Sequence, residues 1–393
     1  MPPRCRFAKT ARPQVSVCTE PFRIFFPLGI LASLVGVLLW PLLYAGGLNF
    51  YPNEAHARLM VQGFVGSFAL GFLGTAFPKM IGSPSLTRYE LALFATVTVG
   101  GSIAHGFNLI AYGDACFLLL WLAVATCLGT RLAFFRDSLP PPGFVLAAMG
   151  IFAGITGTIL LLVGRISTLT EFQRALAPLL LNEAFILGPI LGVGGFLFPR
   201  FFTPTEDRDR KPWRQRANFH LVIGLLLLGT LVSQAAGSET LAPLARAGIV
   251  LAILFANLPM LRRGTSTGSL STMLRLALLL VVIGIAASLA PPAARIAAKH
   301  TLFIGGYGML ILAVASRVTW GHSGNIALAE GRRRSLQVII WVLLFAFTTR
   351  VVAGFIPTIR VSHHIYAALL WSIAVGIWTW AVLKYIRVAD PED

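Results

Sequence analysis

The stretch HTLFIGGYGMLILAVASRVTWGHSGN, residues 300–325, is almost entirely apolar and has a histidine near each end. An α-helix rises about 1.5 Å per residue, so His300 and His322 would lie roughly 33 Å apart, close to the thickness of a bilayer core. The stretch therefore predicts a membrane-spanning helix. Because one straight helix cannot bring both imidazoles to a single metal or cofactor, each is expected at its own membrane face.

The composition of the whole chain agrees with this interpretation. Hydrophobic residues make up 56% of the sequence and charged residues 12%, whereas an ordinary soluble domain has about 25% charged residues. The net charge of +17 comes from arginines scattered singly between apolar runs. Nucleic-acid-binding surfaces instead gather basic residues in one patch. The composition predicts a polytopic membrane protein whose partner is the lipid bilayer, with no nucleic acid.

Hydropathy in a window of about 19 residues predicts an all-α integral membrane protein with about twelve transmembrane helices. They form a single membrane domain over residues 24–386, between a basic tail at 1–23 and a short tail at 387–393. The predicted spans are 24–46, 59–81, 90–111, 115–135, 143–164, 176–199, 219–236, 243–261, 271–290, 300–319, 336–356 and 364–386.

The basic residues also predict the orientation of these helices. With both termini in the cytoplasm, about 23 of the 32 Lys and Arg residues fall in connections on the cytoplasmic side, as the positive-inside rule requires. The connection RFFTPTEDRDRKPWRQR then lies inside and AYGDAC outside. We expect the protein in the inner (cytoplasmic) membrane, with both tails in the cytoplasm.

The predicted orientation gives each histidine a depth. Two histidines, His220 and His322, fall toward the inner face. A single histidine at this depth is most often an interfacial ring, but a neutral imidazole also ligates metal ions and haem iron. Five on one face therefore indicate a cofactor. These five are His56, His105, His300, His363 and His364.

Other chemistry finds less support. The four cysteines include no C-x-x-C pair typical of zinc, iron–sulfur or c-type haem sites. No connection carries a P-loop, which disfavours ATP-driven transport by this chain alone. The glycine-rich patches GSFALGFLG, GPILGVGG and GGYG predict close helix packing, and they could equally leave room for a flat porphyrin.

Four stretches together are similar to one known family. Residues 300–325 combine His300, three glycines, Arg317 and a Gly-His-Ser-Gly turn. The other three stretches are EPFRIFFPLGIL from Glu20, HARLMVQGFVGSFALGFLGTAFPKMIGSP from His56 and GPILGVGGFLFPRFF. They resemble the NnrS family of membrane haem and copper proteins. The resemblance implies haem binding, copper as a second cofactor, and a role in protecting cells that meet nitric oxide.

The start of the second span departs from the family pattern His-x-His-Glu-Met. The sequence there reads His56, Ala57, Arg58, Leu59 and Met60. Arginine does not give up its proton to coordinate a metal, so one ligand implied by the resemblance is missing. The chain could carry haem without copper, or neither. The pair His363 and His364 could substitute, although adjacent helical residues point about 100° apart and only one can face a given site.

The same layout suggests which residues hold a cofactor. Haem–copper oxidases hold a low-spin haem between imidazoles of their second and tenth spans, and His56 and His300 stand at the corresponding places. We expect these two as axial ligands, because a single helix cannot clamp both faces of a porphyrin. The sixth and seventh spans lack a set of three histidines, which disfavours a catalytic binuclear centre. The predicted cofactor-binding residues are His56, His300, His322 and Arg350, and the predicted metal ligands are His105, His363 and His364.

Charged residues within the spans need partners. Glu183 and Arg350 lie at similar predicted depth, so they are expected either to pair or, for Arg350, to meet a haem propionate. Arg246 lies nearer a span end and is expected to snorkel toward water.

Two other functions stay open. A cofactor-free transporter or channel would have an internal repeat, or broken helices lining a midplane cavity. The sequence shows no convincing repeat, and only Pro189 and Pro199 are candidate breaks. A structural or assembly subunit of a respiratory complex would tolerate loss of the outer histidines and co-purify with a partner.

Overall fold

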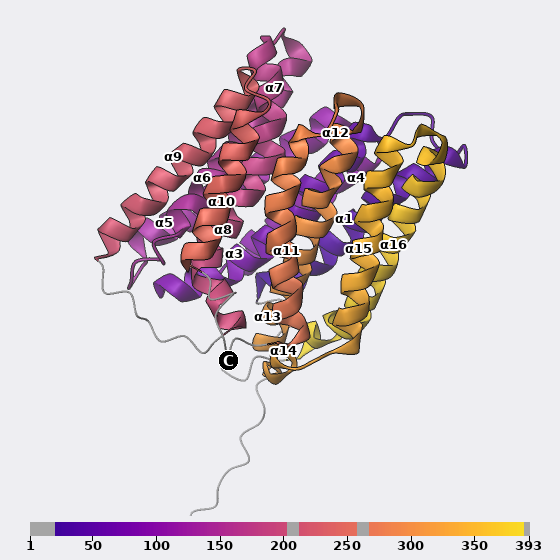
Figure 1. The fold of residues 1–393 in the computed structure, drawn as a ribbon. Coiled ribbons are helices and arrows are strands. Elements are labelled where there is room, and N and C mark those ends of the chain that lie inside the picture. Colours follow the sequence, from indigo (N-terminus) through magenta and orange to yellow (C-terminus); the bar gives the residue numbers. More distant parts are fainter. Residues whose placement is uncertain (1–19, 203–211, 258–266, 389–393) are drawn as a thin grey trace, which may run out of the picture.

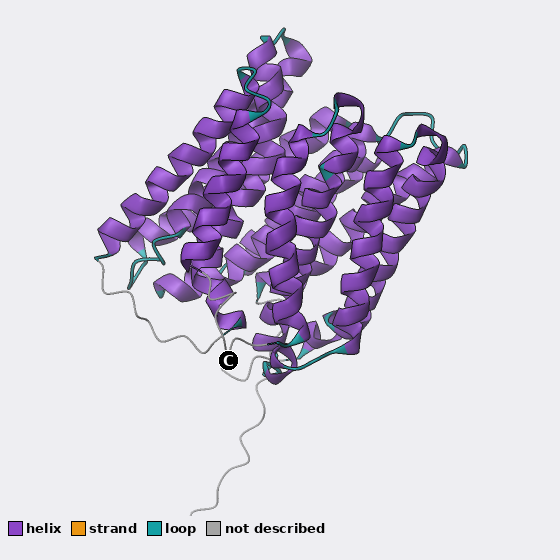
Figure 2. Cartoon of the chain, viewed as in Figure 1, coloured by secondary structure: helices purple, strands orange, loops and turns teal. Residues whose placement is uncertain are grey.

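The computed structural model describes residues 20–202, 212–257 and 267–388, and every regular element in these ranges is helical (Figure 2). The long and short α-helices are α1 (Pro21–Tyr44), α2 (Asn53–Arg58), α3 (Gly66–Ile81), α4 (Arg88–Gly106), α5 (Ile110–Phe134), α6 (Phe144–Ile166), α7 (Glu171–Leu179), α8 (Phe185–Leu197), α9 (Trp213–Ala235), α10 (Leu241–Asn257), α11 (Ser269–Ala286), α12 (Pro292–Ala298), α13 (Met309–Gly321), α14 (Ala327–Glu330), α15 (Arg334–Phe355) and α16 (Arg360–Ala381). Short 3₁₀ turns cover Phe198–Phe201, Ala287–Leu289, Pro357–Ile359 and Leu383–Arg387.

The predicted all-α membrane fold is confirmed. Ten helices in the described ranges are long and apolar enough to cross a membrane. The two remaining predicted spans correspond to α4 and to α10, a shorter apolar helix. Most of the predicted N-terminal tail, residues 1–19, lies outside the described residues, and α1 already begins at Pro21. The cytoplasmic location of both termini stays a prediction.

Three of the helices contain a π-helical segment in their first half. These segments are Leu59–Val65, Leu180–Ala184 and Thr301–Gly308. Their first residues are equally spaced along the chain, and the Phe-Pro-Lys and Phe-Pro-Arg tripeptides at 77–79 and 198–200 repeat at the same interval. The expectation that the chain has no internal repeat is therefore wrong. Hydropathy concealed the repeat because the three units share helix geometry more than residue identity.

Glycines allow α6 and α8 to approach closely. A Cβ atom added to Gly188 would lie 2.6 Å from the Cα atom of Gly150, and one added to Gly192 would lie 2.5 Å from the carbonyl oxygen of Gly143. Real side chains do not reach such distances, so glycine is needed at this crossing. Likewise, a Cβ atom on Gly308 would lie 2.8 Å from the Trp371 ring. These glycines serve helix packing, and the space beside them is filled by protein.

The bundle has two distinct ends. The short helices α7 and α12 lie at one end and α14 lies at the other (Figure 1). We call the end with α12 the outer end and the end with α14 the inner end, following the predicted orientation. His300 lies between α12 and the π-helical segment Thr301–Gly308, and His322 directly follows α13, so these two histidines lie toward opposite ends of one continuous helix.

Candidate functional site

Three histidines and an arginine from separate helices form a group at the outer end. His56 lies in α2, His300 at the end of α12, Arg350 in α15 and His364 in α16. His300 interacts electrostatically with each of the other three. Arg350 also interacts with His56 and with His364. The fold thus brings together four of the seven residues predicted as cofactor or metal ligands, and we call them the outer histidine group.

The ring nitrogens of His56 and His300 are oriented alike. Nδ1 of His56 lies 2.9 Å from the carbonyl oxygen of Gly36, and Nδ1 of His300 lies 2.8 Å from that of Ile296. A carbonyl oxygen only accepts, so each Nδ1 carries the proton and donates it, which leaves the lone pair on Nε2. Histidines that ligate metals usually have their other ring nitrogen anchored in this way. The donor set therefore suits axial ligation of a haem iron by both Nε2 atoms.

Two aromatic residues of α1 complete the group. The Trp40 ring lies edge-on to both neighbouring imidazoles, with centroids 6.0 Å from His56 and 5.1 Å from His364. The Tyr44 hydroxyl lies 2.8 Å from Nδ1 of His364. Neither residue was predicted from the sequence. The one signal for them is their spacing: they lie one helical turn apart, near the end of the first span.

The remaining predicted ligands lie elsewhere. His105 is a buried residue of α4, His322 lies at the inner end, and His363 lines a groove between α15 and α16. In the described part of the chain, no three His, Cys, Asp or Glu side chains lie close enough together to hold a metal ion. Copper binding therefore stays a hypothesis that rests on the family resemblance.

Arg58, which departs from the family pattern, belongs to a buried polar network. Its Nε donates to Oδ1 of Asp114 at 2.8 Å, and Nε2 of Gln62 donates to the same oxygen at 2.6 Å. Nε2 of His105 lies 2.8 Å from Oε1 of Gln62. All four side chains are buried. A buried guanidinium requires such a counter-charge, so Asp114 explains how this chain accommodates a buried arginine at position 58.

Glu183 forms a second buried ion cluster. Its carboxylate lies 2.8 Å from Nη2 of Arg246 and 2.9 Å from Nζ of Lys299. Arg246 is 0% exposed and also donates to Oε1 of Gln234 at 2.7 Å. The expected pairing of Glu183 with Arg350 is therefore wrong, and so is the expectation that Arg246 snorkels. The depth of a residue along its span does not reveal the direction of its side chain. Glu183 faces α10 and the end of α12, whereas Arg350 faces the three histidines of the outer histidine group.

At the inner end, Glu20 contacts three basic side chains. Its carboxylate lies 2.7 Å from Nη2 of Arg23, 3.4 Å from Nζ of Lys79 and 2.8 Å from Nδ1 of His322. Arg23 also donates to the carbonyl oxygens of His322, at 3.2 Å, and of Val388, at 2.7 Å. This inner ion cluster joins the start of α1, the end of α3, the turn after α13 and the C-terminal end of the described chain. The stretch EPFRIFFPLGIL, through Glu20 and Arg23, and the Gly-His-Ser-Gly turn, through His322, thus meet at one site.

The inner ion cluster predicts a pH dependence of stability. Burial alone would raise the pKa of Glu20, but hydrogen bonds and charges from His322 and Arg23 lower that pKa from 4.5 to about 2. The stabilisation is therefore complete above pH 4.5 and is lost as the pH falls through the folded-state pKa of about 2. We expect wild type to exceed Glu20→Gln in stability by on the order of 3 kcal/mol at pH 7, with the difference shrinking below pH 4.5. Thermal unfolding of both proteins over this pH range measures the difference, and a gap that does not change with pH would contradict the expectation.

Comparisons with known proteins give a family match and a fold match. The sequence pattern of the family described as NnrS protein matches residues 16–388. Among solved structures, the chain is similar to a haem–copper terminal oxidase dimer determined by cryo-electron microscopy, with a TM-score of 0.54 and 12% identity, over 95% of this chain and 84% of that one. At this identity the likeness concerns the fold alone. No curated protein matches the sequence.

Proposed function

Because the chain belongs to the NnrS family over residues 16–388, we propose that it is a haem-binding membrane protein of the nitric oxide response. The haem would be held near the outer membrane face between His56 and His300. One observation carries the proposal: two imidazoles on different helices meet in one group, each with Nδ1 anchored to a backbone carbonyl. A bound haem would supply an iron centre that takes up nitric oxide or passes single electrons.

Arg350 supports this assignment. Among the described residues its guanidinium has no acidic partner, although it lies within electrostatic range of His56, His300 and His364. A cation among neutral imidazoles at this depth needs an anion. A haem propionate would provide one, and the guanidinium would fix its orientation through charge-assisted hydrogen bonds.

The proposal is limited to one haem without a catalytic binuclear centre. Where the sixth and tenth spans meet, the polar residues are Glu183 and Lys299, joined by Arg246 from α10. The single carboxylate of Glu183 is engaged by two cations, and the cluster contains no imidazole. Its residues join α10, the end of α12 and the helix that carries Glu183.

A reduced-minus-oxidised visible spectrum with pyridine haemochrome quantification tests the proposal. Purified wild type is expected to show a Soret band, which shifts when nitric oxide is added. His56→Ala and His300→Ala should each lower haem occupancy by about tenfold or more, which corresponds to about 1.4 kcal/mol of lost binding energy. His363→Ala is the matched control, because His363 lies outside the outer histidine group, and it should retain the haem. Wild type without haem, despite haem supplied during expression, would refute the proposal.

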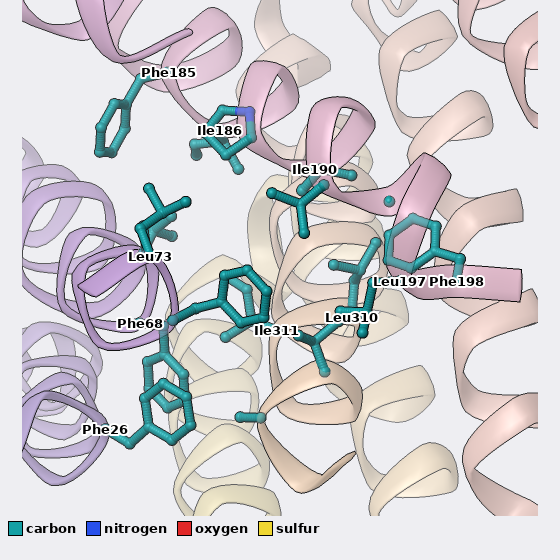
Figure 3. A pocket seen from close by; sticks show the side chains of 18 residues that line it. Phe26, Phe68, Leu73, Phe185, Ile186, Ile190, Leu197, Phe198, Leu310 and Ile311 are labelled. Carbon is teal, nitrogen blue, oxygen red and sulfur yellow. The ribbon is translucent and has the colours of Figure 1, made fainter. Parts of the chain in front are cut away.

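A small-molecule transporter is the second candidate, and one observation favours it. The three helices with π-helical segments converge on an apolar cavity of about 90 Å³. Its walls include Phe68 of α3, Phe185 of α8 and Leu310 of α13 (Figure 3). A repeat with irregular helices around a central cavity is typical of transporters. The apolar walls suit only a small apolar solute. Absence of haem from the wild-type protein would favour this function.

A further inference from the structure

A groove of about 620 Å³ lies between α15 and α16 and belongs to no site described above. One end of it is polar. Thr348 and Thr349 line it from the last turns of α15, and His363 and Tyr366 line it from the first turns of α16. The rings of His363 and Tyr366 lie side by side, with centroids 5.4 Å apart. His363 immediately precedes His364 in α16, so the groove adjoins the outer histidine group.

Several polar atoms of this groove have no hydrogen-bond partner among the described residues. Other helical hydroxyls of the bundle donate to the carbonyl one turn earlier, as Ser372 does to Ala368 at 2.8 Å. In the described chain neither Thr348 nor Thr349 makes any such bond. Nδ1 of His363 lies 3.0 Å from the carbonyl oxygen of Ile359, which leaves Nε2 as an acceptor. Polar groups without partners are costly in an apolar environment, so a polar ligand atom would stabilise this end of the groove.

The rest of the groove is apolar, and most of it lies on the surface of the bundle nearer the middle of α15 and α16. Phe345 of α15 and Leu369 and Ile373 of α16 line it, each following the polar residues toward the middle of the membrane. No charged side chain lines the groove, so a phosphate group would find no cation. The lining instead matches a neutral ring with carbonyl or hydroxyl groups and an apolar tail.

We propose that this groove binds the ring of an isoprenoid quinone or quinol. The threonine hydroxyls and the Tyr366 hydroxyl donate to the ring carbonyls, and Nε2 of His363 accepts from a quinol hydroxyl. The tail lies along Phe345, Leu369 and Ile373. The volume is in the range of ordinary small-molecule sites. The ring would lie beside the proposed haem site, but its binding does not depend on haem.

Photolabelling tests the proposal. The probe is an azido-benzoquinone with a decyl tail, added to detergent-purified wild type, Thr349→Val and His363→Leu. Thr349→Val removes one hydroxyl and keeps the shape of the side chain, and Ser372→Ala in α16 is the control, because that hydroxyl already has a partner. We expect label on residues 345–373, competed away by decylubiquinone. Each groove variant should lower it about fivefold, the effect of losing one hydrogen bond of about 1 kcal/mol, and the control should not.

Two results would overturn the proposal. Label that is unchanged in both groove variants would mean that these polar groups do not bind the ring. Competition by phosphatidylglycerol as effective as by decylubiquinone would make the groove a lipid site. Both results can be obtained with or without bound haem, so a failed quinone proposal can be told apart from a failed haem proposal.

Discussion

Glu183→Gln is expected to destabilise the protein by about 3–5 kcal/mol, the usual result of removing one partner from a buried ion pair. Glutamine keeps the shape of the side chain but leaves two cations, Arg246 and Lys299, without their counter-charge. Arg246 is 0% exposed and cannot reach water. Thermal unfolding of detergent-purified protein, followed by loss of the monodisperse peak in size-exclusion chromatography, measures the effect.

Glu239→Gln provides the matched control for this variant. Glu239 lies 2.9 Å from Arg295, but its side chain is 60% exposed, and exposed pairs contribute at most about 1 kcal/mol. Replacing Arg246 by Met in the Glu183→Gln background should recover part of the loss, because it removes one of the unpaired cations. Equal stability of Glu183→Gln and Glu239→Gln would contradict the buried-cluster account.

Asp114→Asn is expected to have a comparable effect, again about 3–5 kcal/mol. A single oxygen of Asp114 accepts hydrogen bonds from Arg58 and Gln62. Asparagine offers an oxygen of similar position but no charge, so the buried guanidinium loses its counter-charge. The same unfolding measurement applies, with Glu54→Gln as control, since Glu54 pairs with Arg165 at the surface.

The double variant Arg58→Met/Asp114→Asn separates charge from shape. Replacing both members of a buried pair by groups of similar size is often nearly neutral. The double variant is therefore expected to be more stable than Asp114→Asn alone. If it is equally unstable or worse, Arg58 does not depend on Asp114 for its burial, and the explanation for the buried arginine at position 58 is wrong.

The sequence was sufficient for the overall fold, and it singled out several residues that the fold brings close together. Apolar runs of spanning length located every long helix, because hydrocarbon allows little else, although some helices begin six to eight residues before the predicted start. His56 and His300 were identifiable because each stands at the outer end of such a run. Their shared site follows from the fold, since the second and tenth spans are far apart in the sequence.

The sequence did not predict which side chains on neighbouring helices contact one another. Depth suggested that Glu183 meets Arg350, whereas Glu183 pairs with Arg246 and Lys299. Hydropathy gives the depth of a residue but not the direction in which its side chain points. The π-helical segments add to this difficulty, because each inserts extra residues into a turn and rotates the side chains that follow. Trp40 and Tyr44 were not predicted because hydropathy does not show which way their side chains point from α1.

The central claim is that His56 and His300 ligate one haem, and electron paramagnetic resonance of the ferric protein tests it most directly. Wild type should give a low-spin signal typical of two imidazole ligands. His300→Gly and His56→Gly should each give a high-spin signal, because one axial ligand is gone, and added imidazole should restore the low-spin signal by filling the vacated space. His363→Gly should stay low-spin throughout. A low-spin signal that survives in either His56→Gly or His300→Gly without added imidazole would contradict the account.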